Sequence, residues 1–294
     1  MKITLQLFVV VSAALVLTTA GSHGQTAYAI ANNGQSLIKF DLSAPGITSL
    51  VGNFNGVATN LDGIDFRPAD GRLYGYGAGG NALVTIDLNT AATAAVPFPS
   101  IGSVTDDLGV DFNPVADRLR LVNVNDENLR INVGTGVTIA DMTLAYVLGD
   151  RNFGINPAIN EAAYTNSDIN PATDTTLFYI DYGRDILVRA LDPNVGSLQT
   201  VGALGVDSTA FTGFDIFSDG SGGNTAYALL TASSGIASLY TVNLNTGAAT
   251  SVGVISQTPA TRPFSLAIQP VPEPGTLFFG FAIAGACLHR RRRG

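Results

Sequence analysis

Three aspartates stand at equivalent places in a repeated pattern, each two residues after a glycine and directly before an apolar residue: Asp65, Asp111 and Asp215. On equivalent strands of a ring of sheets, these carboxyls could surround one end of a central channel, where grouped oxygens can bind a metal or a sugar. An active site breaks symmetry, however, and a repeated short acid commonly caps backbone amides at turns. We therefore expect a structural role and keep a metal site as the alternative.

The residues that could ligate a metal are Asp111, Glu161, Asp168 and Asp215. Asp168 lies in a loop where it alternates with Asn166 and Asn170, as oxygen ligands of calcium do, but the Gly and final Glu of a calcium-binding EF-hand loop are missing. Glycoside hydrolysis needs two paired carboxyls, and no spacing pairs Glu161 with a particular acid. We assign no catalytic residue and expect no cofactor, with calcium as the one metal that suits the available ligands.

The composition excludes several classes of chemistry. Both histidines (His23 and His289) and the single cysteine (Cys287) lie in the terminal segments, so residues 25–269 contain neither type. Disulfides, thiolate nucleophiles, histidine bases, haem and ordinary zinc or copper sites are therefore excluded from this body. With 10 basic and 22 acidic residues, the body carries a net charge near −12, which argues against nucleic acid as a partner.

The two ends of the chain have the composition of export signals. Residues 1–24 begin with Met1-Lys2, continue with an apolar stretch from Leu7 to Leu17 and end in small residues, which predicts a secretory signal peptide. Residues 270–294 contain a Val-Pro-Glu-Pro motif, a short apolar run from Leu277 to Leu288 and a basic stop of four arginines. The motif and the stop consist of Val271, Pro272, Glu273, Pro274, Arg290, Arg291, Arg292 and Arg293.

This carboxy-terminal order resembles the PEP-CTERM sorting signal of Gram-negative bacteria. The resemblance implies transient membrane insertion through a short transmembrane helix, recognition by an exosortase-type processing enzyme, and delivery to the cell surface, the outer membrane or the extracellular matrix. A plain membrane anchor is the alternative. Twelve residues at about 1.5 Å each make only about 18 Å of helix, which is short for a hydrocarbon core of roughly 30 Å.

Residues 25–269 show a repeated sheet pattern. Short apolar alternations are separated by turn residues, which predicts an all-β fold. A short Asp or Asn turn recurs at Asp41, Asp87, Asn132, Asp192 and Asn243, with spacings of 46, 45, 60 and 51 residues. This period is typical of four-stranded β-propeller blades. We predict five blades, with six as an alternative and a β-sandwich or solenoid as the fallback.

The two ends of the body complement each other. It begins with a second-strand sequence at Thr26–Ile30 and ends with an inner-strand sequence at Phe264–Ile268, so pairing of the terminal strands would close the ring. The Gly-Ile-Asp-Phe-Arg-Pro segment from Gly63 and the Asp-Arg-Leu-Arg-Leu-Val-Asn segment from Asp117 resemble the domain-of-unknown-function 4394 family of secreted bacterial proteins. That resemblance implies a propeller-like fold and no assigned activity.

We therefore expect an exported propeller without enzymatic activity, acting as a structural or binding component at the cell surface or in the exopolysaccharide matrix. Exopolysaccharide and surface glycans are the expected ligands, and surface tyrosines such as Tyr74, Tyr76, Tyr164, Tyr179 and Tyr182 could stack on sugars if they do not pack inside. The alternative is a calcium-assisted, lactonase- or esterase-like hydrolase on the same scaffold. The two differ in symmetry, because an enzyme needs acids and amides that depart from the repeat and converge at one channel mouth, whereas a scaffold needs none.

Overall fold

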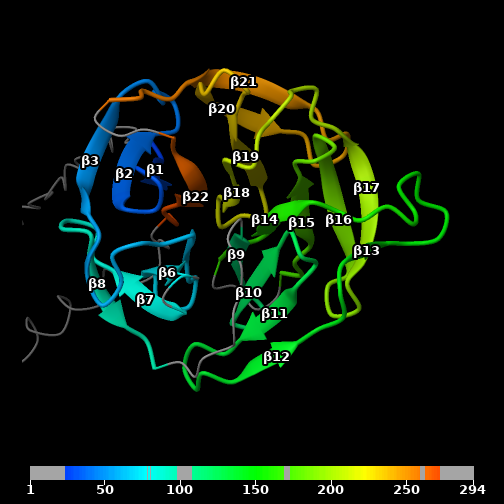
Figure 1. Cartoon of the computed structure of the whole chain (residues 1–294), viewed down its shortest axis with the longest axis horizontal. Coiled ribbons are helices and arrows are strands. Elements are labelled where there is room, and N and C mark those ends of the chain that lie inside the picture. The colour runs from blue at the N-terminus through cyan, green and yellow to red at the C-terminus, as the bar shows by residue number, and fades with distance from the viewer. Residues whose placement is uncertain are drawn as a thin grey trace, which may run out of the picture.

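A computed structural model describes residues 24–271, apart from residues 78, 80, 98–107, 169–172 and 259–261. Within these ranges all regular secondary structure consists of β-strands, and five small sheets surround a central axis (Figure 1). The predicted five-bladed β-propeller is confirmed. The predicted signal peptide, the residues of the tail from Pro272 onward and the apolar run that was expected to cross the membrane lie outside the described residues.

Each blade contains four antiparallel strands, ordered from the central axis outward. Blade 1 consists of β22 (Phe264–Ile268), β1 (Thr26–Ala31), β2 (Ser36–Asp41) and β3 (Thr48–Asn53). Blade 2 consists of β5 (Gly63–Phe66), β6 (Leu73–Gly77), β7 (Ala82–Ile86) and β8 (Ala92–Ala95). Blade 3 consists of β9 (Leu108–Asn113), β10 (Arg118–Asn123), β11 (Asn128–Ile131) and β12 (Thr138–Ala140).

Blade 4 consists of β14 (Ile159–Tyr164), β15 (Leu177–Asp181), β16 (Ile186–Asp192) and β17 (Ser197–Ala203). Blade 5 consists of β18 (Thr212–Ser218), β19 (Asn224–Thr231), β20 (Ala237–Val242) and β21 (Ala249–Val254). Two short strands, β4 (Asn55–Gly56) and β13 (Ala145–Tyr146), pair in parallel with the outer strands of blades 2 and 4. They cover sheet edges that would otherwise expose unpaired backbone groups.

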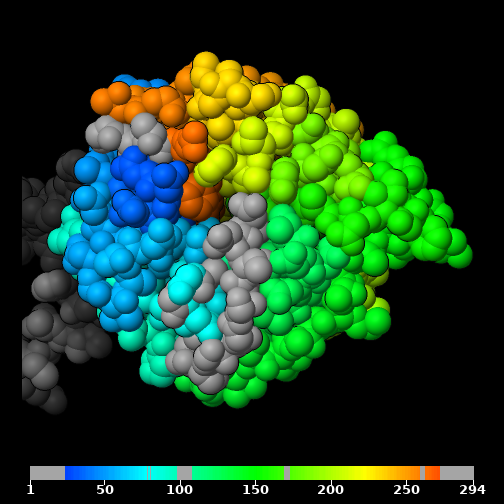
Figure 2. Space-filling model, viewed as in Figure 1, coloured from blue at the N-terminus to red at the C-terminus, as the bar shows by residue number. Residues whose placement is uncertain are grey.

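The ring closes through the two ends of the body, as the sequence predicted. β22 pairs antiparallel with β1, where Ala27 faces Ile268 and Ala29 faces Leu266. In Figure 2 the orange atoms of this last strand lie against the blue atoms of the first segment. This pairing completes blade 1 without a covalent bond between distant parts of the chain.

The repeated Asp and Asn residues form the turns that separate the third and fourth strands. Each of the five accepts a hydrogen bond from the backbone N–H two residues later, at Asp41, Asp87, Asn132, Asp192 and Asn243. Short polar side chains stabilise such turns because they replace a missing backbone partner. The period that was read from the sequence is thus a period of turns.

The hydrophobic core is divided into five layers, one at each interface between neighbouring blades. Blades 1 and 2, for example, bury Ile30 and Leu37 against Ile64 and Leu73, and blades 4 and 5 bury Ile180 against Phe214. Tyr74, Tyr76, Tyr164 and Tyr179 are buried in these layers, and Tyr182 packs half-buried at the edge of one. They are packing residues and do not form a sugar-stacking surface.

Candidate functional site

The inner strands β5, β9, β14, β18 and β22 surround the central channel with two layers of side chains. Residues two apart on a strand point to the same side, so equivalent positions of the five strands form rings. The first layer consists of Gly63, Gly109, Glu161, Gly213 and Ser265. The second layer consists of Asp65, Asp111, Ala163, Asp215 and Ala267. Both layers are buried, and each departs from the repeat in blades 4 and 1.

The glycines of the first layer let neighbouring inner strands approach each other. A Cβ atom at Gly109 would lie 2.5 Å from the Cα of Glu161, and one at Gly213 would lie 2.8 Å from the backbone nitrogen of Leu266. Where a larger residue occupies this layer, the strand is irregular. β14 shifts its register between Ile159 and Glu161, and β22 has a similar shift at Ser265, whose φ is 47°. Bulges of this kind redirect side chains.

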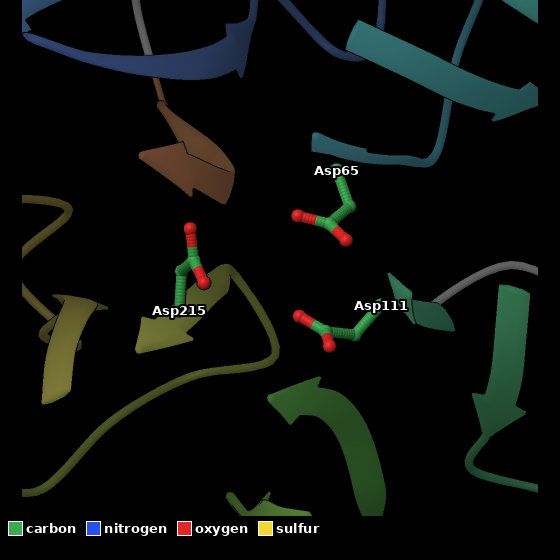
Figure 3. Close-up of side chains that lie close together, drawn as sticks. All are labelled: Asp65, Asp111 and Asp215. Atoms are coloured by element: carbon green, nitrogen blue, oxygen red, sulfur yellow. The ribbon is translucent and has the colours of Figure 1, made fainter. Parts of the chain in front are cut away.

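The three aspartates of the second layer point toward one another across the channel (Figure 3). Each offers a carboxylate oxygen, and these oxygens all lie within 4.8 Å of one another. All three residues are almost fully buried, with exposed fractions of 4%, 3% and 6% for Asp65, Asp111 and Asp215. We call these three residues the aspartate ring.

The carboxyls of the aspartate ring connect neighbouring blades. Asp65 accepts the N–H of Phe66 on its own strand at 2.7 Å and the N–H of Phe112 on blade 3 at 2.7 Å. Asp215 likewise accepts from Ile216 on its own strand and from Ile268 on blade 1, both at 2.6 Å. Asp111 accepts from Tyr164 on blade 4 at 3.0 Å. The expected capping role is thus present, but most of the amides belong to the next blade and none to a turn.

Blades 4 and 1 carry alanine in the second layer, and other side chains connect them to the neighbouring blades by hydrogen bonds. Ser265 Oγ accepts the N–H of Ile64, which connects blade 1 to blade 2 at 3.0 Å. Asn160 of blade 4 donates to the carbonyl of Ala210 at 2.8 Å and accepts from the hydroxyl of Thr212 at 3.0 Å. Each of the five blade junctions therefore has a polar contact beside its apolar layer.

Burial and mutual repulsion favour the protonated form of the aspartate ring. Burial raises the pKa of Asp65, and the nearby charge of Asp215 raises it further. Burial and the charges of Asp65, Asp215 and Glu161 raise the pKa of Asp111. Burial raises the pKa of Asp215 to about 7, although two backbone N–H groups oppose the shift. Three charges at this separation repel by about 3.5 kcal/mol per pair at an effective dielectric of about 20, so protons or a cation must balance them.

The aspartate ring has a spacing that suits calcium. An ion at the centre of three oxygens separated by 4.8 Å or less would lie at most about 2.8 Å from each of them, close to Ca–O distances of roughly 2.3–2.6 Å. The same oxygens accept backbone N–H groups, which leaves fewer lone pairs for an ion. The arrangement can thus hold protons or a hard cation, and its hydrogen bonds are those of a structural element.

The predicted metal ligands are distributed over three places. Asp111 and Asp215 meet in the ring together with Asp65, the third aspartate of the repeat. Glu161 lies in the first layer, close enough to influence the pKa of Asp111. Asp168 is buried beside Ser218, whose hydroxyl donates to it at 3.4 Å, and it is not part of the ring. Asn170 lies outside the described residues.

A cavity of about 570 Å³ opens at the end of the channel where the inner strands begin. Its walls include Asn160, Glu161 and Thr212 from the inner-strand side, and Asn60 and Asp62 from the loop that precedes β5. Phe211 and Phe264, whose rings meet edge to face at a centroid distance of 6.2 Å, form an apolar part of the wall. Among the described residues that line this cavity there is no lysine, arginine or histidine.

The cavity contains the departures from the repeat, which sequence reasoning missed except for Glu161. Blade 4 places Glu161 where blades 2, 3 and 5 have glycine, and the register shift of β14 falls at the adjacent Asn160. An alignment of the five inner-strand sequences would have marked Glu161 and Ser265 as the two residues that replace the repeated glycine. The contributions of Asn60, Asp62 and Thr212 have no signal in the sequence, because they depend on how the loops fold over the channel end.

Comparisons with solved structures find matches at low sequence identity. A crystal structure of a nidogen/laminin complex matches with 12% identity and a TM-score of 0.49, covering 83% of this chain and 98% of that chain. A protein of unknown function from Bacteroides thetaiotaomicron matches with 14% identity and a TM-score of 0.47, covering 69% of this chain and 53% of that one. Hydrazine synthase of Kuenenia stuttgartiensis matches with 15% identity and a TM-score of 0.40, covering 69% and 52%.

The sequence itself matches two family models. No curated protein matches the chain. The PEP-CTERM protein-sorting motif matches residues 270–293, which agrees with the tail expected from the sequence. It indicates an exported, surface-directed protein of a Gram-negative bacterium that is processed by exosortase-type machinery. Within the described residues, none of the elements is a helix with the length and apolar character needed to cross a membrane. Residues 36–265 match the domain of unknown function DUF4394, and the chain belongs to this family.

Proposed function

We propose that this protein is a surface-directed binding component without enzymatic activity, and that its ligand occupies the cavity at the start of the inner strands. The observation that carries the proposal is asymmetry. A purely structural propeller would repeat the small first-layer residue in each blade, whereas this chain places a buried Glu161 and a register shift beside the cavity. Departures of this kind create a specific site in an otherwise repeated scaffold.

The chemistry of the cavity suits a neutral saccharide. Amide, hydroxyl and carboxyl groups from Asn60, Asp62, Glu161 and Thr212 supply hydrogen-bond partners of the kind that sugar hydroxyls use. Its volume of about 570 Å³ falls in the range of small-molecule sites, roughly 300–1,000 Å³. The described residues that line the cavity include two carboxyls and no cation, which disfavours an anionic ligand. Exopolysaccharide chain ends or surface glycans meet these requirements.

Binding of neutral oligosaccharides to the purified protein tests this function, with calorimetry as the measurement. We expect Glu161→Gln to weaken binding about tenfold or more, because a lost hydrogen bond to a charged group is worth about 1.5–3 kcal/mol. Asn60→Ala, at an exposed and neutral residue, should weaken binding about two- to tenfold, because a neutral hydrogen bond is worth about 0.5–1.5 kcal/mol. Asn89→Ala is the matched control, since Asn89 is exposed in a turn and does not line the cavity. Equal binding by all three variants would place the ligand elsewhere.

We further propose that residues 25–269 form the delivered body, preceded by a signal peptide of residues 1–24 and followed by a sorting tail of residues 270–294. The matched sorting motif supports the last of these boundaries. Replacing Glu273 and Pro274 by alanine should leave uncleaved protein in the membrane fraction of the host, visible as a larger band on an immunoblot. Normal release of this variant would contradict the proposed tail.

A calcium-assisted hydrolase, lactonase- or esterase-like, is the second candidate. The observation in its favour is the approach of three carboxylate oxygens within 4.8 Å. It is the weaker candidate because Glu161 lies in the other layer and the carboxyls of the ring bond backbone amides of neighbouring blades. Calcium should raise both the melting temperature and ester or lactone turnover if this candidate is correct. If calcium changes neither the melting temperature nor the turnover, the hydrolase is excluded.

A further inference from the structure

The direction of the last strand determines which end of the channel faces the membrane when the tail is inserted. β22 begins at Phe264, which lines the large cavity, and ends at Ile268, which lines a small pocket at the opposite end of the channel. Pro270 lines the same small pocket, together with Asp65 and Asp215. The chain therefore leaves the body near the central axis, at the end opposite the cavity. We call that end the exit face.

The chain between the body and the apolar run is short. Val271 is the last described residue, and the apolar run begins at Leu277. Six residues span at most about 21 Å even when fully extended. This length limits how far the body can turn relative to the membrane.

The opposite orientation needs a longer connection. From the exit near the axis, the chain would have to pass outward over four strands, which is about 14 Å at a strand spacing of about 4.8 Å. It would then have to return along the height of the blade, about 20 Å for seven-residue strands such as β18. The sum of about 34 Å exceeds the reach of the connection.

We propose that the inserted protein holds its exit face toward the lipid surface and presents the large cavity away from it. The proposal rests on tail insertion and on the cavity location of the proposed function, and it adds the orientation of the body. The proposal needs no lipid binding by the exit face, where acidic residues pair with Arg67 and Arg72. Arg67, for example, pairs with Asp70 and Asp117. The short connection alone fixes the orientation, and the cavity remains accessible to ligands before the tail is cut.

Two exposed serines on hairpins of blade 5 allow a matched test. β18 runs from the cavity end to the exit end, so the turn with Ser221 lies on the exit face. β19 returns antiparallel, so the turn with Ser234 lies on the cavity face. Because the body has no cysteine, Ser221→Cys and Ser234→Cys each give one labelling site in a chain that also carries Cys287→Ser.

The full chain carrying a donor dye at either position is reconstituted into liposomes whose lipid headgroups carry an acceptor dye. We expect energy transfer at position 221 to exceed that at position 234 by about twofold or more, since the two turns are separated by the height of the blade, about 20 Å. Equal transfer at both positions, or stronger transfer at 234, would overturn the orientation. Absence of transfer at both positions would show that the tail does not insert, and would overturn the premise while leaving ligand binding in the cavity untouched.

Discussion

The aspartate ring predicts that the propeller loses stability as the pH rises from 5 to 7. The pKa of Asp215 is raised to about 7 by burial, so its folded form keeps a proton that the unfolded chain releases near pH 4. A group with a raised folded pKa contributes stability that is complete below its unfolded pKa and is lost as the pH rises through its folded pKa. The loss is about 1.4 kcal/mol per pH unit for each such group while only the folded state holds the proton.

Between pH 5 and pH 7, the pKa shift of Asp215 alone should therefore lower the free energy of unfolding by about 2–3 kcal/mol. That corresponds to a fall in melting temperature of roughly 4–12 °C for a body of this size. Asp65 and Asp111, whose pKa values are also raised, add to the loss. Few other groups change the stability between pH 5 and pH 7. Residues 25–269 contain no histidine. Carboxyls with lowered pKa values, such as Asp70 and Asp150, lose their contribution to stability only in stronger acid.

Thermal unfolding followed by circular dichroism at constant ionic strength measures this effect. Asp111→Asn removes one ionisable carboxyl of the ring, and its amide oxygen can still accept the N–H of Tyr164. We expect the variant to show a shallower fall in melting temperature between pH 5 and pH 7. Asp207→Asn, at an exposed position, should keep the wild-type slope. A wild-type melting temperature that is constant or rises over this range would refute the assignment of protons to the ring.

Three further predictions concern stability and are read from urea-induced unfolding. Gly109→Ala should destabilise by about 1–3 kcal/mol, because its Cβ would lie 2.5 Å from the Cα of Glu161, whereas Gly79→Ala, with nothing within 4 Å, should be neutral; equal effects would contradict the close approach of the inner strands. Leu266→Ala should cost about 2–5 kcal/mol, since this buried side chain belongs to the strand that closes the ring, and a negligible loss would argue against closure by β22. Arg120→Ala should cost about 3–5 kcal/mol, because buried Arg120 pairs with Asp141 at 2.6 Å and also bonds Asn128, Asn194 and Tyr164; a loss below about 1 kcal/mol would mean that the network is not a stability element.

The propeller itself could be predicted because its signals are local. Each Asp or Asn turn is formed by a side chain and an amide two residues away, so the residues from Asp41 to Asn243 report the blade period directly. The complementary strand sequences at Thr26–Ile30 and Phe264–Ile268 likewise predicted the closure that β1 and β22 make. The export tail is a linear motif and needs no folded context to be recognised.

The candidate sites depend on contacts between blades, which no spacing along the chain specifies. The repeat indicated that Asp65, Asp111 and Asp215 are equivalent, but their separation and their bonds to amides of the next blade follow from the angle at which the apolar layers pack. Asp168 is also an aspartate, but it is not part of the ring because its loop packs against Ser218.

The amino-acid sequence by itself determined the repeated strands, the turns, a ring of five or six blades, the closing pair and the absence of imidazole and thiol chemistry from the body. Only the tertiary structure decided that the three aspartates meet in a buried ring, where burial raises their pKa values, and that Glu161 borders a cavity with Asn60, Asp62 and Thr212. The physical reason is the distance along the chain over which the interactions act. Turns and strand alternation arise from interactions over a few residues, whereas burial, and with it each pKa shift, arises from five blades that meet around one axis.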